Sequence, residues 1–347
     1  LAMGQASNAV DYKLADGLRY RYEVENCVKE MAGQDVKGKL KTAGVDKVAS
    51  IKVKEKDSGN KIAVLYAEGE IRDDDSSSPF SADEQVISEE MANKLRKLKD
   101  DDDVKAVVFR VNSPGGSAFG SEQIWYAVTE LKKEKPVIVS MGDYAASGGY
   151  YISCNADSIV ADPTTLTGSI GIFGMFPNVK GLTDKIGLSF DVVKTNTYAD
   201  FGAMGRPLND GEKALMQNMV NEGYELFVKR CAEGRGMTTD EIKKIAEGRV
   251  WTGTKAKELG LVDELGGLDK ALEIAIGKAG LDAYTVMSYP GKKSFFDMLT
   301  DTKPGGYIQS RILKGKVGEL YNQFDWLNNF ENCDKIQARV PFELNIN

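Results

Sequence analysis

Ser147 is followed by Gly148 and Gly149 and preceded by a short apolar run, Val137–Val139. The run predicts a buried strand, and the serine with its glycines falls at the first turn of a predicted helix. A serine there lies at the positive end of the helix, beside backbone N–H groups that have no intrahelical acceptor. Acyl-transfer enzymes place a nucleophile and part of an oxyanion hole in such surroundings. An isolated Ser-Gly-Gly is more simply interpreted as a helix N-cap, so the rest of the chain must distinguish the two.

The 347 residues include no histidine. A Ser-His-Asp triad, a Cys-His dyad and every His-ligated metal site are therefore excluded within this chain. If Ser147 is a nucleophile, its base must be another group, and lysine is the usual substitute. Burial lowers the pKa of a lysine toward neutrality, which allows its neutral amine to accept a proton.

The charge balance and the cysteines exclude further classes. A net charge of −7 and a pI near 5.1 leave no basic face for phosphates, so we expect no nucleic-acid partner. The four cysteines are scattered and form no CxxC pair, which argues against a disulfide framework or a zinc site. No apolar run approaches the length of a membrane span, and no signal peptide opens the chain. We expect neither a cofactor nor a metal.

Apolar strand patterns and amphipathic helix patterns alternate after residue 60. We expect strands at 61–71, 104–111, 137–140 and 158–162, and helices at 81–99 and 121–133. This rhythm indicates an α/β core whose strands pair largely in parallel. Later patterns predict a strand at 190–194, a long helix at 209–233, a short helix opened by Thr238, helices at 254–259 and 268–278, and an alternating strand at 336–346.

A second glycine turn, Gly115-Gly116, directly follows the predicted strand at 104–111. In a parallel sheet, this turn and the Ser147 turn fall on the same edge, at the carboxyl ends of the strands. An N–H of the glycine pair and the N–H of Gly148 can then supply two donors to a tetrahedral oxyanion. Glycine suits this role because it has no Cβ to obstruct the substrate.

Three motifs in this order resemble the signal peptide peptidase A (protease IV) family: Arg110–Gly116 (RVNSPGG), Tyr144–Tyr150 (YAASGGY) and Leu166–Ile172 (LTGSIGI). The resemblance runs from about Lys61 to Gly280. It implies a Clp-protease/crotonase-like α/β fold of repeated β-β-α type units, with additional helices and a C-terminal tail. It also implies a Ser-Lys dyad serine protease that degrades cleaved signal peptides in the bacterial cell envelope.

The resemblance also implies roles for particular residues. Ser147 matches the nucleophile, and Ser169 matches a serine that hydrogen-bonds the catalytic lysine. Gly115, Gly116 and Gly148 match the donors of the oxyanion hole. Membrane association with the catalytic domain outside the cytoplasm, and a ring- or bowl-like homo-oligomer, are expected from the same family.

The general base departs from the pattern of the short family members. They carry a lysine followed by Asp in the loop before the long helix, and here Ala199-Asp200 falls at those positions. In long, duplicated members the lysine comes from the amino-terminal half and the serine from the carboxyl-terminal half. Lys194 is the nearest alternative base, although a lysine in the predicted strand at 190–194 is more simply an outward-facing side chain.

Self-comparison connects this departure with the start of the chain. The segment from Ala9 aligns without a gap on the segment from Ala256, and Ala32-Gly33 then falls on Ala279-Gly280. We therefore interpret residues 1–35 as the tail of an upstream copy of the same domain. Residues 36–60 form a linker or edge strand, 61–280 the peptidase domain and 281–347 a C-terminal extension.

The predicted function is a serine endopeptidase acting on signal peptide remnants or other apolar peptides. An absent N-terminal half would supply the lysine and any membrane attachment, so this chain alone would be nearly inactive. Two alternatives stay open: a crotonase-like acyl-CoA enzyme, which would not need Ser147, and a non-catalytic scaffold that binds peptides.

Overall fold

The computed structural model describes residues 7–44, 59–73, 85–289 and 336–339. The chain divides into two compact units, residues 1–55 and residues 56–347. In the first unit, the described residues form helices α1 (Ser7–Asp11) and α2 (Arg21–Met31).

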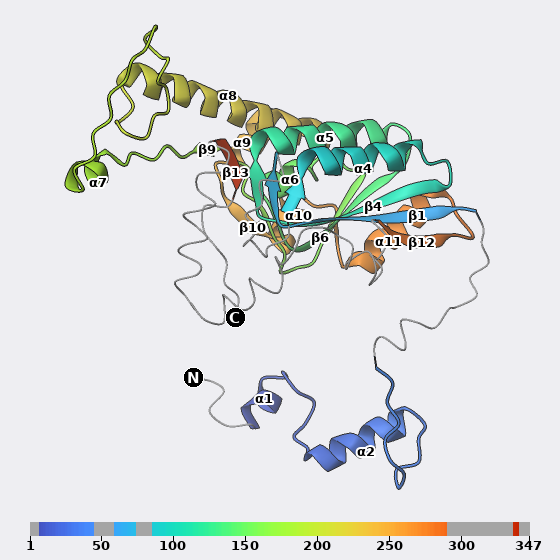
Figure 1. Cartoon of the computed structure of the whole chain (residues 1–347). Helices are drawn as coiled ribbons and strands as arrows, with labels where there is room; N and C mark the ends of the chain where they lie inside the picture. The colour runs from blue at the N-terminus through green and yellow to red at the C-terminus, as the bar shows by residue number, and fades with distance from the viewer. Residues whose placement is uncertain (1–6, 45–58, 74–84, 290–335, 340–347) are drawn as a thin grey trace, which may run out of the picture. The chain divides into compact units, whose positions relative to one another are not determined.

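The second unit is organised around a largely parallel sheet (Figure 1). Among the described residues its strands are β1 (Lys61–Glu68), β4 (Val104–Ser113), β6 (Val137–Ala146), β7 (Ser158–Ala161), β8 (Leu166–Gly168), β10 (Val250–Thr252), β11 (Glu264–Leu265) and β12 (Thr285–Tyr289). The strand order is β10-β8-β6-β4-β1-β12, and β7 pairs with both β6 and β11. Only the β10–β8 pair of this sheet is antiparallel among the described strands. The predicted α/β fold with a parallel core is confirmed.

A second sheet of short strands lies beside the carboxyl ends of the first. Its described strands are β2 (Glu70–Arg72), β3 (Gln85–Ile87), β5 (Gly115–Ser117), β9 (Phe173–Gly174) and β13 (Ile336–Arg339), in the order β3-β2-β5-β13-β9. The strand predicted at 61–71 is divided between the two sheets at Gly69, whose φ is +94°. A positive φ is readily available only to glycine, which allows the chain to leave one sheet and enter the other.

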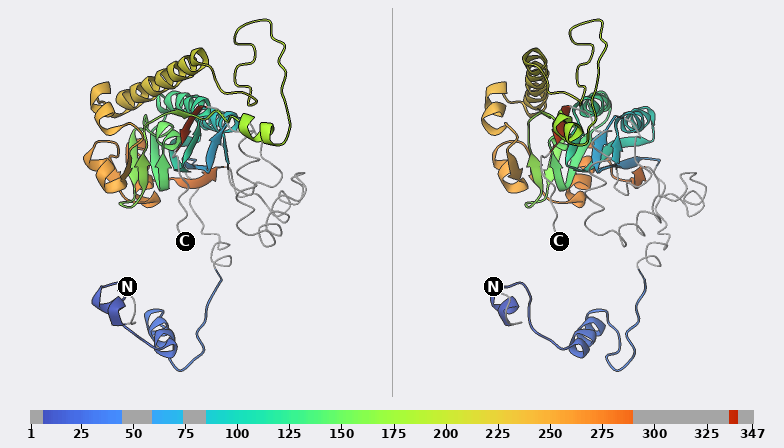
Figure 2. Two further views of the ribbon diagram at one scale, coloured as in Figure 1. Left: turned by 90° about the vertical axis from the view of Figure 1, so that its left-hand side faces the viewer. Right: turned by 60° about the vertical axis from the view of Figure 1, so that its left-hand side comes forward.

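Helices cover both faces of the main sheet (Figure 2). On one face, α4 (Ser88–Asp100) and α5 (Ala118–Lys132) bury apolar side chains such as Leu95 and Ile124 against Phe109 of β4. On the other, α11 (Leu268–Ala279) packs Ala271 against Val108. Successive residues of a strand point to opposite faces, which places Val108 and Phe109 in different cores.

Further helices complete the described second unit: α6 (Gly148–Tyr151), α7 (Lys180–Lys185), α8 (Asp210–Arg235) and α9 (Thr239–Ile245), followed by α10 (Gly253–Glu258) before β11. The long helix predicted at 209–233 is confirmed and begins with a capping box between Asn209 and Glu212. The strand predicted at 190–194 is wrong, because these residues form an exposed loop. In the described residues, no helix is long and apolar enough to cross a membrane.

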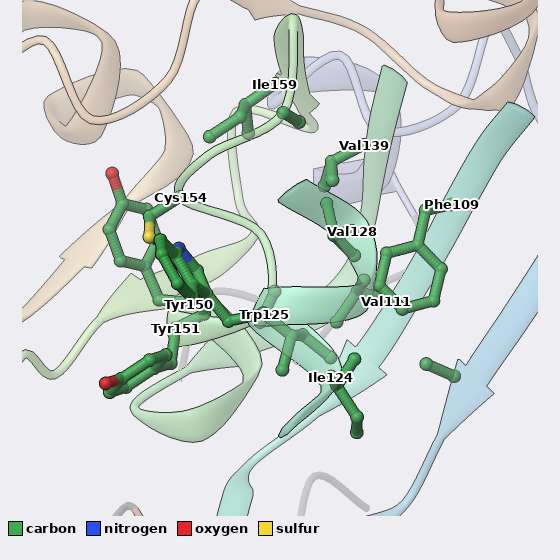
Figure 3. Packing of buried hydrophobic residues seen from close by; sticks show 14 of the residues in the cluster. Phe109, Val111, Ile124, Trp125, Val128, Val139, Tyr150, Tyr151, Cys154 and Ile159 are labelled. Atoms are coloured by element: carbon green, nitrogen blue, oxygen red, sulfur yellow. The ribbon is translucent and has the colours of Figure 1, made fainter. Parts of the chain in front are cut away.

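The core beneath the Ser147 turn is aromatic (Figure 3). Tyr150 and Tyr151 of α6 are buried, and the Tyr151 ring stacks on Phe227 of α8 with centroids 4.4 Å apart. The Tyr150 hydroxyl donates to the carbonyl of Leu261 at 2.9 Å. Large buried side chains thus anchor the short helix α6 directly after Ser147.

Candidate active site

Ser147 lies on a sharp turn between strand β6 and helix α6. Its φ of +53° and ψ of −116° are rare for a residue with a Cβ and store backbone strain. The Ser147 N–H donates to the carbonyl of Gly168 at 2.9 Å, and the Ser147 carbonyl accepts the N–H of Tyr151 at 2.8 Å. Hydrogen bonds on both sides therefore hold the serine in a conformation that the isolated chain would avoid.

The hydroxyl of Ser147 is buried and has no hydrogen-bond partner in the part of the chain that the structure describes. Ser147 has no exposed surface, and among the described residues its Oγ has no hydrogen-bond partner. Leaving a buried hydroxyl unpaired costs about 1–3 kcal/mol. An unpaired Oγ on a strained turn does nothing for stability, and both features are typical of a group retained for chemistry.

The glycine turn packs against the Ser147 turn, as the sequence predicted. A Cβ on Gly149 would lie 2.5 Å from the carbonyl oxygen of Ser113, so the two turns approach as closely as backbone allows. Ser113 Oγ accepts the N–H of Gly115 at 3.2 Å, which is the contact of a turn residue. The Gly115 amide is thus directed at Ser113.

Gly116 occupies a position that only glycine can fill. Its φ is +153°, and a Cβ there would overlap the carbonyl oxygen of Ile71 in strand β2. The close approach of β2 fixes the Gly116 amide within the second sheet, beside α6. The amides of Gly116 and Gly148 therefore lie on the two turns that the structure brings together.

Ser169 occupies the neighbouring strand end. Ala146 of β6 and Gly168 of β8 are register partners, so Ser147 and Ser169 each follow one member of the same pair. Ser169 is buried, has a φ of +49°, and donates its N–H to the Arg249 carbonyl at 2.7 Å. The structure places the two serines at adjacent strand ends of one sheet edge.

Lys194 is held by an ion-pair network in the segment before α8. Its Nζ donates to Asp200 Oδ1 at 2.8 Å and to the Thr197 carbonyl at 3.3 Å. Arg206 Nε donates to the other Asp200 oxygen at 2.8 Å, and the Arg206 and Lys194 contacts together hold the pKa of Asp200 below its usual range. Figure 1 shows this segment, with α7, extending beyond the start of α8 and away from α6. The structure does not bring Lys194 to Ser147 Oγ.

The same network begins helix α8. Both Glu212 carboxylate oxygens accept hydrogen bonds from Arg206, at 2.6 and 2.8 Å, and Glu212 has no exposed surface. The Arg206 guanidinium and the backbone N–H of Asn209 lower the pKa of Glu212 to about 2. Glu212 is therefore ionised at neutral pH and ties the loop to the first turn of the helix.

Residues of α5 and α8 that no sequence motif marks pack behind the Ser147 turn and support it. The Tyr151 hydroxyl donates to Glu122 Oε2 at 2.7 Å, and burial together with this carboxylate raises the pKa of Tyr151. Arg230 of α8 pairs with Glu122 and lies 3.8 Å from the centroid of the Trp125 ring. These contacts join α5, α6 and α8, and no local sequence pattern marks them because their members are far apart in the chain.

No cluster of three or more His, Cys, Asp or Glu side chains that could hold a metal ion occurs in the described residues. The chemistry available at this sheet edge is that of hydroxyl and backbone amide groups. A hydroxyl on a strained strand-to-helix turn, facing a glycine turn, has the arrangement of a nucleophile with adjacent oxyanion donors.

The fold is α/β with a largely parallel sheet, and the site is a buried serine hydroxyl on a strained strand-to-helix turn. Residues 129–282 match the model of Peptidase family S49. The chain belongs to this family, which includes the signal peptide peptidase A (protease IV) proteins.

Relatives in this family differ in length. Protease 4 of Haemophilus influenzae is 45% identical over 305 residues, covering 80% of this chain and 48% of the relative. The chloroplastic serine protease SPPA of Arabidopsis thaliana is 35% identical over 318 residues, covering 88% of this chain and 46% of the relative. A protein of Enterococcus faecium that carries the name signal peptide peptidase SppA is 34% identical over 254 residues. The match covers 73% of this chain and 74% of the relative. This chain thus spans about half the length of the first two relatives.

Among solved structures, a mutant of ClpP1 from Listeria monocytogenes is 16% identical and has a TM-score of 0.41. The superposition covers 60% of this chain and 94% of that chain.

Proposed function

We propose that this chain carries the nucleophile of a Ser-Lys serine endopeptidase whose general base comes from an N-terminal half. Ser147 Oγ attacks a peptide carbonyl while the lysine amine takes the hydroxyl proton. The amides of Gly116 and Gly148 stabilise the oxyanion, the C–N bond breaks, and the amine leaves with that proton. Water then hydrolyses the acyl-serine. The observation that carries this proposal is the buried, unpartnered Oγ on a strained turn.

The first unit supports an upstream copy that would provide the lysine. In the register that matches Ala9 with Ala256, α2 falls on α11 and α1 falls on α10. The first and last residues of the matched helices nearly coincide. Gly33 and Gly280 correspond, and their φ angles are +64° and +62°. Two pairs of helices with matching bounds, and a glycine of positive φ after the second of each pair, support the interpretation of residues 1–35 as a repeat.

The exposed face of α2 points to the same conclusion. Val24 and Val28 correspond to Ala271 and Ala275, which α11 buries on the main sheet. In α2 these valines are 47% and 43% exposed. An apolar helix face without a sheet is expected where the sheet that it covers belongs to a preceding copy.

Ser169 would orient the incoming lysine. It is buried at the strand end next to Ser147, so an amine that reaches Ser147 Oγ also comes within reach of this second hydroxyl. A hydrogen bond from the amine to Ser169 would fix its position for proton transfer.

The substrates would be extended apolar peptides, including cleaved signal peptides, bound as an added strand.

We also propose that the protein is associated with the membrane through its N-terminal half, in the bacterial cell envelope with the catalytic domain outside the cytoplasm. We further propose that it forms a homo-oligomer. Exposed apolar side chains gather in the segment of α7 and the loop after it: Leu182, Ile186, Leu188, Phe190 and Val193. Such a surface favours contacts between copies.

A fluorophosphonate probe tests the proposal in the two-half protein. Ser147 should be modified, and Ser147→Ala should abolish both the labelling and peptide hydrolysis. Ser169→Ala should slow labelling by about 10²-fold or more, because the proton-transfer geometry is lost. Ser288→Ala, at an exposed serine of β12, is the matched control and should leave the rate unchanged.

Two results would contradict the proposal. Turnover of an acyl-CoA that survives Ser147→Ala would favour the crotonase-like alternative. Absence of labelling in the folded two-half protein would favour a non-catalytic scaffold.

A further inference from the structure

Cys154 and Cys231 are two thiols buried in the core behind the Ser147 turn. Cys154 follows shortly after α6, and Cys231 lies in the carboxyl-terminal half of α8. Neither has any exposed surface, and both are free thiols in the structure. Figure 3 shows Cys154 beside the aromatic side chains of α6. The two cysteines are far apart in the chain, so no spacing motif marks them as a pair.

Contacts on either side of the two cysteines place them against each other. On one side, the Tyr151 ring stacks on Phe227 with centroids 4.4 Å apart. On the other, a Cβ on Gly234 would overlap the carbonyl oxygen of Cys154, so α8 touches the backbone there. Phe227, Cys231 and Gly234 recur at helical spacing and share one face of α8. Cys231 lies between the two contacts on that face and is therefore directed at Cys154.

The two thiols share apolar surroundings. Both side chains belong to the same hydrophobic cluster, and Cys154 Sγ donates to the Tyr151 carbonyl at 3.2 Å. Burial and the neighbouring Cys154 thiol raise the pKa of Cys231. Buried cysteines in apolar surroundings react slowly, because the thiolate is the reactive form. The pair therefore keeps, while the domain stays folded, the oxidation state in which the chain folded.

We propose that Cys154 and Cys231 form a disulfide that clamps the segment after α6 to α8, when the chain folds in the presence of a disulfide donor. The donor is a small-molecule or protein disulfide. The thiolate of one cysteine attacks a donor sulfur, which forms a mixed disulfide and releases one donor thiol. The second cysteine attacks the mixed disulfide, which forms the Cys154–Cys231 bond and releases the other donor thiol. The cysteine pair is oxidised by two electrons, the donor is reduced by two, and the two cysteine protons pass to the donor thiols.

The bond would strengthen the support of the Ser147 turn. The Tyr151 N–H donates to the Ser147 carbonyl at 2.8 Å, and the Cys154 N–H donates to the Tyr150 carbonyl at 2.8 Å. A disulfide from Cys154 to α8 ties the end of this hydrogen-bonded turn to a long helix. Disulfides persist outside the bacterial cytoplasm, which is the location proposed above. The inference does not rest on the proposed peptidase chemistry, and its test supplies the donor directly.

Counting thiols by mass spectrometry tests the bond without altering either cysteine of the pair. The full chain with Cys27→Ser and Cys333→Ser retains only Cys154 and Cys231. It is refolded from urea with oxidised and reduced glutathione, unfolded again and treated with iodoacetamide. The refolded chain should take up no iodoacetamide, and should be alkylated twice after reduction. Two free thiols, glutathione adducts or disulfide-linked dimers would overturn the proposal.

A displaced cysteine provides the matched control. In the same background, Cys231→Ser with Lys229→Cys keeps two cysteines and nearly the same length of chain between them. The Lys229 side chain is 62% exposed, on a different face of α8 from Cys231. This control should keep two free thiols after the same refolding. A bond formed equally in both proteins would overturn the proposal, because the fold would not be directing the pairing.

Urea unfolding tests the clamp. The oxidised pair should unfold at about 1 M higher urea than the reduced pair, because the bond closes a long loop in the unfolded chain. Cys154→Ala in the same background cannot form the bond, so its midpoint should be the same with oxidised and reduced glutathione. Equal midpoints for the oxidised and the reduced pair would overturn the clamp.

Discussion

The N–H of Ser147 donates a hydrogen bond of 2.9 Å to the carbonyl of Gly168, the residue directly before Ser169. This bond joins the carboxyl ends of β6 and β8 just beyond the register pair Ala146–Gly168. Both serines have φ near +50° although both carry a Cβ. The strained turn and the neighbouring serine are therefore one structural unit, in which the proposed nucleophile and the proposed lysine-orienting hydroxyl are positioned together.

Strain at Ser147 predicts that glycine is more stable there than alanine. A positive φ costs a residue with a Cβ about 1–3 kcal/mol, and glycine avoids most of this cost despite its greater freedom in the unfolded chain. Ser147→Gly should unfold at higher urea than Ser147→Ala, with a free-energy difference of about 1 kcal/mol. At Ser153, whose φ is not positive, the order should reverse. A lower midpoint for Ser147→Gly than for Ser147→Ala would show that the turn is not strained.

The contact between Gly149 and Ser113 predicts that one methyl group added at Gly149 would push the two turns apart. Gly149→Ala places a Cβ 2.5 Å from the Ser113 carbonyl oxygen and should cost about 1–3 kcal/mol in urea unfolding. It should also slow labelling of Ser147 in the two-half protein. Gly277→Ala in α11 meets no atom within 4 Å and should instead stabilise by up to about 1 kcal/mol. Equal unfolding midpoints for the two variants would contradict the close packing.

The main sheet and its helices could be predicted because their patterns are local and long. Strands such as β4 are continuous apolar runs, and α4 and α8 show helical periodicity or a capping box. The second sheet could not be predicted, since β5 and β9 are too short to show alternation. The adjacent Val192 and Val193 have the residue type of a strand, which is why a strand was predicted. In the structure the segment is an exposed loop, and its apolar side chains pack on no sheet among the described residues.

The site was only partly visible in the sequence. The order of the two glycine turns and the parallel pairing were enough to predict that Ser147 and Gly116 approach each other. The strain at Ser147, its burial and the register of β13 depend on contacts between distant segments. The Glu122–Arg230 pair depends on such contacts as well, so it has no local signal.

The depressed pKa of Glu212 predicts a pH-dependent contribution to stability. Its folded value of about 2 lies below its ordinary value of 4.5, so the contribution is full above 4.5 and disappears as the pH falls toward 2. Glu212→Gln should therefore lower the urea midpoint at pH 7 and have a smaller effect at about pH 3. Glu222→Gln changes an exposed carboxylate of the same helix and should have little effect at either pH. A Glu212→Gln effect of the same size at both pH values would contradict the Arg206 ion pair.

The contacts of Lys194 predict that it is dispensable for chemistry. Its Nζ is engaged by Asp200 and the Thr197 carbonyl, within a segment that extends away from α6. Lys194→Gln in the two-half protein should leave the rate of Ser147 labelling within about twofold of the unchanged protein, because no proton transfer passes through it. A loss comparable with that of Ser169→Ala would instead identify Lys194 as the base and remove the need for an N-terminal lysine.

The correspondence of α2 with α11 predicts opposite effects for one substitution at two equivalent positions. Ala271→Asp places an unpaired carboxylate in the core beneath the main sheet and should cost about 3–5 kcal/mol in urea unfolding of this chain. Val24→Asp changes a side chain that is 47% exposed and should stay within about 0.5 kcal/mol. In the two-half protein, where an upstream sheet would cover Val24, the second substitution should become as costly as the first. If Val24→Asp stays neutral there too, α2 does not cover the sheet of a preceding copy.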